Sequence, residues 1–144
     1  MRTIKLRVFH NGKIFGYEEL RADGWYSMCP ELNPDKGERW DRIVMTGDGF
    51  TRVQSTGLRD KNGKEIYEHD LVKAKRGNTS LGDMNDIYEI VWHDEYACFC
   101  YKCVKSDNFY RVGKIAESRS HPFFVTQKIT EVIGNQFEHP NLLK

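Results

Sequence analysis

The chain has 144 residues, enough for one compact domain or two small subdomains that share a core. Apolar residues make up 39% of it and charged residues 30%, which favours a folded chain with a water-exposed surface over wholesale disorder. Lys and Arg number 22 against 21 Asp and Glu, so no overall positive field attracts nucleic acid or an anionic membrane. Any such binding must come from a local patch.

The cellular compartment follows from what the sequence lacks. The first residues alternate apolar with charged side chains instead of forming the apolar run of a signal peptide, and no stretch reaches membrane-spanning length. We therefore expect a protein of the bacterial cytoplasm, whose cysteines stay reduced and form no disulfide framework. These cysteines are Cys29, Cys98, Cys100 and Cys103.

The first predicted hairpin lies at the N-terminus. Residues 4–8 alternate apolar with charged side chains, a period of two that places the apolar ones on one face of a strand. Asn11-Gly12 tolerates the positive φ angles of a type I′ turn, and apolar character resumes over residues 14–17.

Two further hairpins are predicted before residue 70. Turn residues crowd positions 28–36, and residues 43–53 then form two strand-like runs around a glycine-rich turn. Asn62-Gly63 supplies the turn of the third hairpin, within residues 58–67.

The rest of the chain alternates short strands with long polar connections. Residues 76–86 and 105–121 are the two long connections, and connections of this length are often mobile or functional. Short helices are considered only at 17–21 and 108–118, where sustained helical spacing is absent. The expected strands cover residues 71–75, 87–93, 96–102, 123–125 and 130–134.

Three segments carry a family resemblance. Residues 56–73 read TGLRDKNGKEIYEHDLVK, which resembles the signature of the YopX family of phage and prophage proteins. The start, RTIKLR at residues 2–7, is similar to that family's R-x-I-K-F-R, and residues 132–143 are similar to its V-I-G-N-x-x-x-N-P-E-L-L end. Because both ends and the centre agree, essentially the whole chain is identified as one family member.

The chain departs from the family pattern at three positions. His69 stands where the family commonly has the glycine of E-G-D, which suits a tight bend with φ above zero. Histidine is among the residues enriched in that region, so we expect the bend to persist and to carry a titratable ring at an exposed corner. His139 replaces an asparagine and Asn141 a glutamate in the final motif.

The resemblance implies a small, mainly β protein with a partly open barrel towards the C-terminus and no established enzymatic role. With the hairpin pattern, it predicts a mainly β fold, β-rich α+β at most, in one compact unit. An N-terminal β-hairpin subdomain is expected over residues 1–55. A small, partly open β-barrel of the Src-homology-three-like type is expected over residues 56–144.

A zinc site is the most specific chemical hypothesis. Thiolates and imidazole are the ligands that zinc prefers, and Cys98, Cys100, Cys103 and His93 lie close together in the sequence. In a regular strand, Cys98 and Cys100 share one side about 7 Å apart, whereas Cys103 faces the other, so convergence needs a turn or bulge. The alternative, which we favour, is a barrel strand over residues 96–103 that points Ala97, Phe99 and Tyr101 inward and uses the cysteines as small apolar fillers.

No residues are expected to be catalytic, and no cofactor is expected. His69-Asp70 and His93-Asp94 resemble pairs used by metal-dependent phosphohydrolases, but such enzymes need further ligands on helices. Both pairs fall at strand ends, where Asp commonly starts a turn. The sequence contains no nucleophile elbow, P-loop or dinucleotide-binding glycine motif.

A basic stretch with aromatic residues is the candidate nucleic-acid interface. Small β-barrels can stack bases on aromatic side chains beside a basic groove, and Phe109 and Tyr110 lie among basic residues. However, lysines that alternate with apolar residues are also the expected outward face of a half-buried strand, and they protect edge strands from pairing. The candidate contacts are Lys73, Lys75, Arg76, Lys102, Lys105, Arg111, Lys114 and Arg119.

The leading functional hypothesis is a non-catalytic phage or prophage accessory protein that acts by protein–protein interaction. Exposed edge strands and long loops suit capture of a phage or host protein, or assembly of a homo-oligomer. Tyr88, Ile90 and Trp92 share one strand face and are expected in the core instead of on a binding platform. Single-stranded nucleic-acid binding through the barrel and residues 102–119 is the alternative, and a zinc-binding module is the second alternative.

Overall fold

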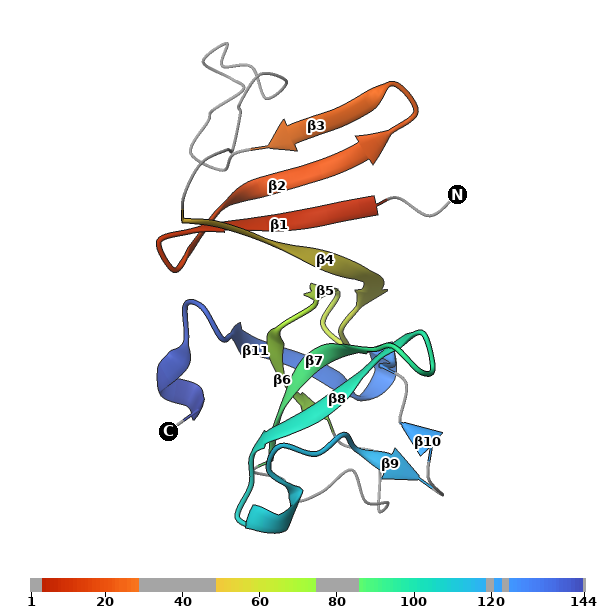
Figure 1. The fold of residues 1–144 in the computed structure, drawn as a ribbon, viewed down its shortest axis with the longest axis vertical. Coiled ribbons are helices and arrows are strands. Elements are labelled where there is room, and N and C mark those ends of the chain that lie inside the picture. Colours follow the sequence, from red (N-terminus) through yellow and green to blue (C-terminus); the bar gives the residue numbers. More distant parts are fainter. Residues whose placement is uncertain (1–3, 29–48, 75–85, 119–120, 123–124, 144) are drawn as a thin grey trace.

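The computed structural model describes residues 4–28, 49–74, 86–118, 121–122 and 125–143. Its N-terminal part is an antiparallel sheet. The strands of this sheet are β1 (Ile4–His10), β2 (Lys13–Arg21), β3 (Gly24–Met28), β4 (Phe50–Arg59) and β5 (Glu65–Tyr67). They are arranged in the order β3-β2-β1-β4-β5 (Figure 1).

The C-terminal part is a second antiparallel sheet. Its strands are β6 (Asp70–Ala74), β7 (Ile87–His93), β8 (Cys98–Lys105) and β11 (Thr130–Asn135), in the order β11-β6-β7-β8. The predicted mainly β fold is confirmed, and the C-terminal sheet stays open within the described part of the chain.

Short elements connect and flank the second sheet. They are the two-stranded pair β9 (Glu117–Ser118) and β10 (His121–Pro122), and the 3-10 helices η3 (Phe109–Arg111), η4 (Gln127–Ile129) and η5 (Pro140–Leu143). None of the helices in the described ranges is long and apolar enough to cross a membrane.

Local turn chemistry explains two of the predicted hairpins. Asn11 and Gly12 have φ angles of 50° and 77°, the positive pair that a type I′ turn requires, and they join β1 to β2 as predicted. In the third hairpin, the Gly63 N–H donates to the Asp60 carbonyl at 3.0 Å, and Gly63 itself has a φ of 86°. This turn brings β5 back along the end of β4.

The second predicted hairpin is only partly visible. Its first strand and most of its turn, residues 43–48, lie outside the described residues. Its second strand is confirmed as the start of β4, which pairs with β1 through contacts such as Leu6 opposite Gln54. β4 also continues through the proposed subdomain boundary between residues 55 and 56.

Of the two short helices considered from the sequence, the first is absent and the second is reduced to one turn. Residues 17–21 belong to β2, because pairing with both β1 and β3 favours the extended conformation. Within residues 108–118, the helical part is only the single 3-10 turn η3. The expected strand from Tyr96 starts later, at Cys98, because Ala97 has a φ of 46° in the β7–β8 turn.

Two apolar clusters make up the core. The C-terminal cluster is formed by Ile66, Val72, Tyr88, Ile90, Tyr101, Cys103 and Val125. The smaller cluster, Phe9, Val53 and Tyr67, comes from β1, β4 and β5 of the N-terminal sheet. Tyr88 and Ile90 therefore occupy the core as predicted. The prediction is wrong for Trp92, which lies near the end of β7, is 45% exposed, and meets the Phe99 ring edge-on with ring centroids 5.0 Å apart.

Candidate functional site

The candidate zinc ligands are divided between the two faces of β8. Cys103 packs in the core on the same face of β8 as Tyr101, whereas Cys98 and Cys100 occupy positions on the other face of the strand. His93 lies directly opposite Cys98 in the β7–β8 register, so the structure brings these two together and leaves Cys103 apart. In the described ranges, no three His, Cys, Asp or Glu side chains gather in a way that could hold a metal ion.

The thiols are also in an environment that disfavours thiolates. Burial raises the pKa of Cys100 to about 11, and it raises the pKa of Cys98 and of Cys103. The Cys100 thiol donates to the Val91 carbonyl at 3.7 Å. Because thiolates are the form that binds zinc, this environment supports the interpretation of the cysteines as small apolar fillers.

The candidate nucleic-acid contacts fall into separate places. Lys73 is exposed on β6, opposite Glu131 of β11. Lys102 and Lys105 lie on β8, and the segment carrying Lys114 runs beside that strand, with the Cys103 N–H donating to the Lys114 carbonyl at 2.9 Å. Lys75, Arg76 and Arg119 lie outside the described residues.

Two aromatic side chains project from the loop after β8. Phe109 is 70% exposed and Tyr110 68% exposed, and their rings stack with centroids 4.1 Å apart. We call this pair the aromatic tip and residues 106–114 the tip loop. Both residues belong to η3, and the ribbon of η3 lies at the end of the molecule opposite β1, β2 and β3 (Figure 1).

The backbone of the tip loop is held by a series of hydrogen bonds. Ser106 Oγ accepts from the Asn108 N–H at 3.0 Å, and Asn108 Oδ1 accepts from the Tyr110 N–H at 3.2 Å, which caps η3. At the base of the loop, the Gly113 N–H donates to the Cys103 carbonyl at 2.7 Å, with a φ of 84° at Gly113. The exposed rings are therefore displayed on a defined backbone.

A buried carboxylate that the sequence does not reveal holds the apex of this loop. Arg111 Nη1 donates to Asp86 Oδ2 at 3.1 Å, and the Asp86 side chain is 0% exposed. The Tyr88 hydroxyl contacts the same oxygen at 3.4 Å. Asp86 comes at the end of the polar stretch before β7, 25 residues from Arg111, and no local pattern links the two.

A second polar network joins the two sheets. Arg7 Nη1 donates to Asp70 Oδ1 at 2.5 Å, and the Tyr67 N–H donates to Asp70 Oδ2 at 2.9 Å. The Arg7 guanidinium also lies 4.0 Å from the centre of the Tyr67 ring. Burial raises the pKa of Asp70, and Arg7 opposes that rise. The result is a fixed joint between β1 and the bend before β6.

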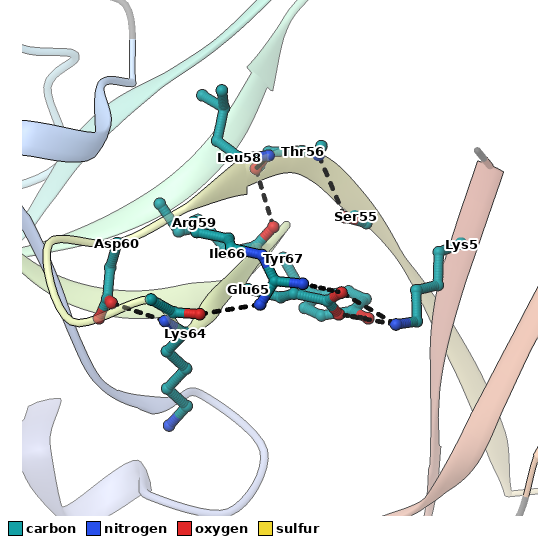
Figure 2. A network of polar contacts seen from close by, with 12 residues as sticks. Lys5, Ser55, Thr56, Leu58, Arg59, Asp60, Lys64, Glu65, Ile66 and Tyr67 are labelled. Atoms are coloured by element: carbon teal, nitrogen blue, oxygen red, sulfur yellow. Dashed lines mark hydrogen bonds and ion pairs between the residues drawn. The ribbon is translucent and has the colours of Figure 1, made fainter. Parts of the chain in front are cut away.

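The joint continues towards solvent through Glu65. Figure 2 shows Lys5 reaching across from β1 to Glu65, whose two carboxylate oxygens it contacts at 2.9 and 3.0 Å. The Tyr67 hydroxyl donates to Glu65 at 2.7 Å. Burial alone would raise the pKa of Glu65, but the hydrogen bonds from Lys5 and Tyr67 hold it below its ordinary value.

His69 forms the corner of this joint. Its φ of 67° confirms the left-handed bend that the family pattern predicts. Its Nδ1 lies 3.2 Å from Glu89 Oε1, and its ring is edge-on to Phe137. The hydrogen bond with Glu89 and the nearby charges of Glu89, Glu68 and Asp70 raise the pKa of His69 against the effect of burial.

Asp60 ties the third hairpin to β11. Its Oδ1 accepts from the Asn62 and Lys64 N–H groups, both at 2.9 Å, and its Oδ2 accepts from the Val132 N–H at 3.0 Å. Figure 2 shows Asp60 beside Lys64 at this turn. Burial alone would raise the pKa of Asp60, but these backbone donors hold it below its ordinary value.

The C-terminal segment closes against the first hairpin. Asn135 Oδ1 accepts from the Phe137 and Glu138 N–H groups, and the Ile14 N–H donates to Glu138 Oε2 at 3.2 Å. The Phe137 ring packs against Phe9 with centroids 4.4 Å apart. The residues of the V-I-G-N end thus fasten the last strand to the N-terminal sheet.

Comparison with protein families agrees with these motifs. The family model described as YopX protein matches residues 8–144, nearly the whole chain. The chain belongs to the YopX family. No curated protein shows significant similarity to it. It is similar to a solved structure, protein EF1440 from Enterococcus faecalis, with 18% identity, coverage of 98% of each chain and a TM-score of 0.45.

The residues of the YopX-like motifs mainly make structural contacts. In the central motif, Asp60 accepts backbone hydrogen bonds, the Tyr67 hydroxyl donates to Glu65, and Asp70 pairs with Arg7. The aromatic tip lies outside the three segments that carry the resemblance. The YopX motifs thus account for how the two sheets are joined, and the exposed tip loop is left as the candidate site of interaction.

Proposed function

We propose that this YopX-family chain is a non-catalytic accessory protein of a phage or prophage, which acts in the host cytoplasm by protein–protein interaction through the aromatic tip. The observation that carries the proposal is the exposure of two stacked rings on a loop with a hydrogen-bonded backbone. Large aromatic side chains exposed in this way are characteristic of the residues that dominate binding energy at protein interfaces.

The defined backbone strengthens this proposal. An aromatic side chain loses little conformational entropy on binding when the loop that carries it is already ordered. Phe109 and Tyr110 have local support from the Asn108 cap and the Gly113 bond, so a partner would meet a preformed surface. The partner is a phage or host protein or a second copy of this chain.

The structural bonds of the buried acidic groups support the non-catalytic part of the proposal. Asp60 accepts backbone hydrogen bonds, Asp70 pairs with Arg7, and Asp86 pairs with Arg111. These are structural bonds, and we assign no reaction step to any of them.

Single-stranded nucleic acid is a second candidate partner for the same loop. The observation that favours it is the position of Lys105 and Lys114, both exposed, at the two ends of the loop that carries the aromatic tip. Bases stack on exposed aromatic faces while lysines contact phosphates, and such binding weakens steeply as salt rises.

Affinity purification from a host in which the prophage is induced tests the proposal. The baits are the wild-type chain, the double variant F109A/Y110A, and Tyr96→Ala as a matched exposed aromatic on the β7–β8 turn. We expect a protein that the wild type and Tyr96→Ala retain and the double variant loses, and that binds the purified wild-type chain directly.

The same samples separate the alternatives. Sedimentation of the purified chain measures self-association, and titration of a labelled oligonucleotide at low salt measures nucleic-acid binding. Tip-dependent binding of only the oligonucleotide would replace the protein partner with nucleic acid. A partner that binds the wild type and F109A/Y110A equally would contradict the proposed role of the aromatic tip.

A further inference from the structure

Asp86 and Arg111 connect the tip loop to the second sheet. Arg111 is the last residue of η3, and it follows Phe109 and Tyr110 directly. Asp86 immediately precedes β7, the neighbour of β8 in the sheet. Their 3.1 Å contact therefore spans from the apex of the loop to a strand that is not adjacent to it in sequence.

The backbone hydrogen bonds within the η3 turn are short-range. The Arg111 N–H donates to the Asn108 carbonyl at 3.0 Å, the Val112 N–H to the Phe109 carbonyl at 3.2 Å, and the Lys114 N–H to the Arg111 carbonyl at 3.1 Å. Such bonds hold the shape of the turn, but they do not determine how the turn is oriented relative to the sheet. The base of the loop is fastened to β8 by the bond from Gly113 to Cys103, and the contact between Arg111 and Asp86 adds an attachment at the apex.

The burial of Asp86 makes this contact durable. A carboxylate that is 0% exposed requires a positive partner, because an uncompensated buried charge is costly. Arg111 is itself 38% exposed, so its side chain extends from the surface of the loop inward to the carboxylate. Tyr88, which is buried in the core, contacts the same oxygen and helps to fix its position.

We propose that the Asp86–Arg111 ion pair is a latch that orients the aromatic tip, which makes Arg111 a positioning residue instead of a phosphate contact. This inference rests on the proposed function for its biological meaning, but the orientation of the rings can be measured in the free protein. A phosphate that bound Arg111 would have to compete with the buried carboxylate for the same guanidinium.

The test compares the wild type with Asp86→Asn, Arg111→Met and Arg111→Lys. Hydrogen exchange is measured at the apex amides, those of Arg111 and Val112, and the ring-proton NMR shifts of Phe109 and Tyr110 report their stacking. The amide of Ile90 in β7 serves as an internal reference for global opening. Arg111→Lys retains the charge, so it provides the conservative rescue.

We expect exchange at the apex amides to be roughly tenfold faster in Asp86→Asn and Arg111→Met, because a hydrogen bond to a charged group is lost. The ring shifts should move towards those of unstacked side chains, exchange at Ile90 should change much less, and Arg111→Lys should recover part of the protection. Unchanged apex exchange and unchanged ring shifts in both Asp86→Asn and Arg111→Met would overturn the latch.

Failure of the proposed function has a different signature. If F109A/Y110A binds every recovered partner as the wild type does, the aromatic tip is not the binding surface, whatever the latch variants show. If the latch variants lose ring order and also weaken partner binding while Ile90 stays protected, both inferences are supported. Arg111→Lys should then restore binding together with ring order.

Discussion

Arg7 of β1 and Asp70 of β6 form a buried ion pair at 2.5 Å, with side chains only 5% and 0% exposed. The two residues are 63 positions apart and belong to different sheets, so this one contact fixes part of the angle at which the sheets meet. Tyr67 stacks under the guanidinium and donates its N–H to the same carboxylate. This arrangement explains why the central motif holds a tyrosine and an aspartate three residues apart.

Breaking the Arg7–Asp70 pair should lower the free energy of unfolding far more than breaking the neighbouring, partly exposed Lys5–Glu65 pair. Arg7→Met leaves Asp70 as a buried charge without its cation, and we expect a loss of about 3–5 kcal/mol in the free energy of unfolding. Lys5→Met removes the pair with Glu65, whose side chains are each 27% exposed, and should cost no more than about 1 kcal/mol. Urea unfolding of both variants measures the contrast, and equal losses would show that the junction does not depend on Arg7.

Asp60 should be intolerant of a change as small as Asp60→Asn. An amide group cannot accept all three backbone N–H bonds that the carboxylate accepts, so a buried donor is left unpaired. We expect a loss of about 2–3 kcal/mol, against less than about 0.5 kcal/mol for the exposed control Asp107→Asn. Chemical denaturation at neutral pH is the measurement.

The pH dependence of the same variant provides an independent check. The pKa of Asp60 is held below its ordinary value. The ionised carboxylate therefore stabilises the fold fully above the ordinary aspartate pKa of about 4, and this stabilisation is lost as the pH falls through the lower pKa of the folded state. The difference in stability between wild type and Asp60→Asn should therefore shrink in acid. A difference that stays constant down to about pH 2 would contradict this interpretation.

His69 should make stability depend on pH in the opposite sense. Its pKa is raised, chiefly by the hydrogen bond with Glu89, so the stabilisation is complete below the ordinary pKa of about 6.5 and is lost as pH rises through the folded value. Glu68 and Asp70 also act on this ring, and Phe137 packs against it. We therefore expect the stability of His69→Gly relative to wild type to be lowest near pH 5 and to increase as the pH rises to about 8.

A second substitution separates charge from backbone conformation at this corner. His69→Asn retains a residue that tolerates a φ of 67°, whereas His69→Gly relieves the backbone entirely. Both variants should show the same trend with pH, and glycine should be the more stable of the two at every pH. Thermal unfolding between about pH 5 and 8 measures this, and a flat difference for both variants would rule out titration of His69.

Gly134 should reject even a methyl group. A Cβ at this position would lie 2.8 Å from Cγ and Nδ1 of His139, the ring that accepts the Asn135 N–H. We expect Gly134→Ala to cost about 1–3 kcal/mol, and to cost clearly less when it is introduced into a His139→Ala background. Equal costs in the two backgrounds would mean that His139 is not the obstacle.

Much of the fold follows from local chemistry in the sequence. Asn11-Gly12 predicts the first hairpin because few other pairs accept two positive φ angles, and His69 marks a left-handed bend through its place in the E-G-D motif. Pairing between distant strands carries no such signal. One partner of β4 is β1, a strand far away in the sequence, as the pairing of Leu6 with Gln54 shows.

The candidate site was only half visible in the sequence. Phe109 and Tyr110 stand out among basic residues, but their exposure depends on a loop built from backbone hydrogen bonds that no composition reveals. Arg111 looks like a phosphate contact until the structure places it against Asp86. That carboxylate is buried by tertiary packing, and in the sequence it is one acidic residue among many.

The most direct test of the account is the dissociation constant between a purified partner recovered with the wild-type chain and three proteins: wild type, F109A/Y110A and Tyr96→Ala. If the aromatic tip carries the interaction, the double variant should bind roughly 30-fold or more weakly, because exposed aromatic anchors dominate interface energies. Tyr96→Ala should bind like the wild type. Equal dissociation constants for the wild type and F109A/Y110A, with both folded, would contradict the account.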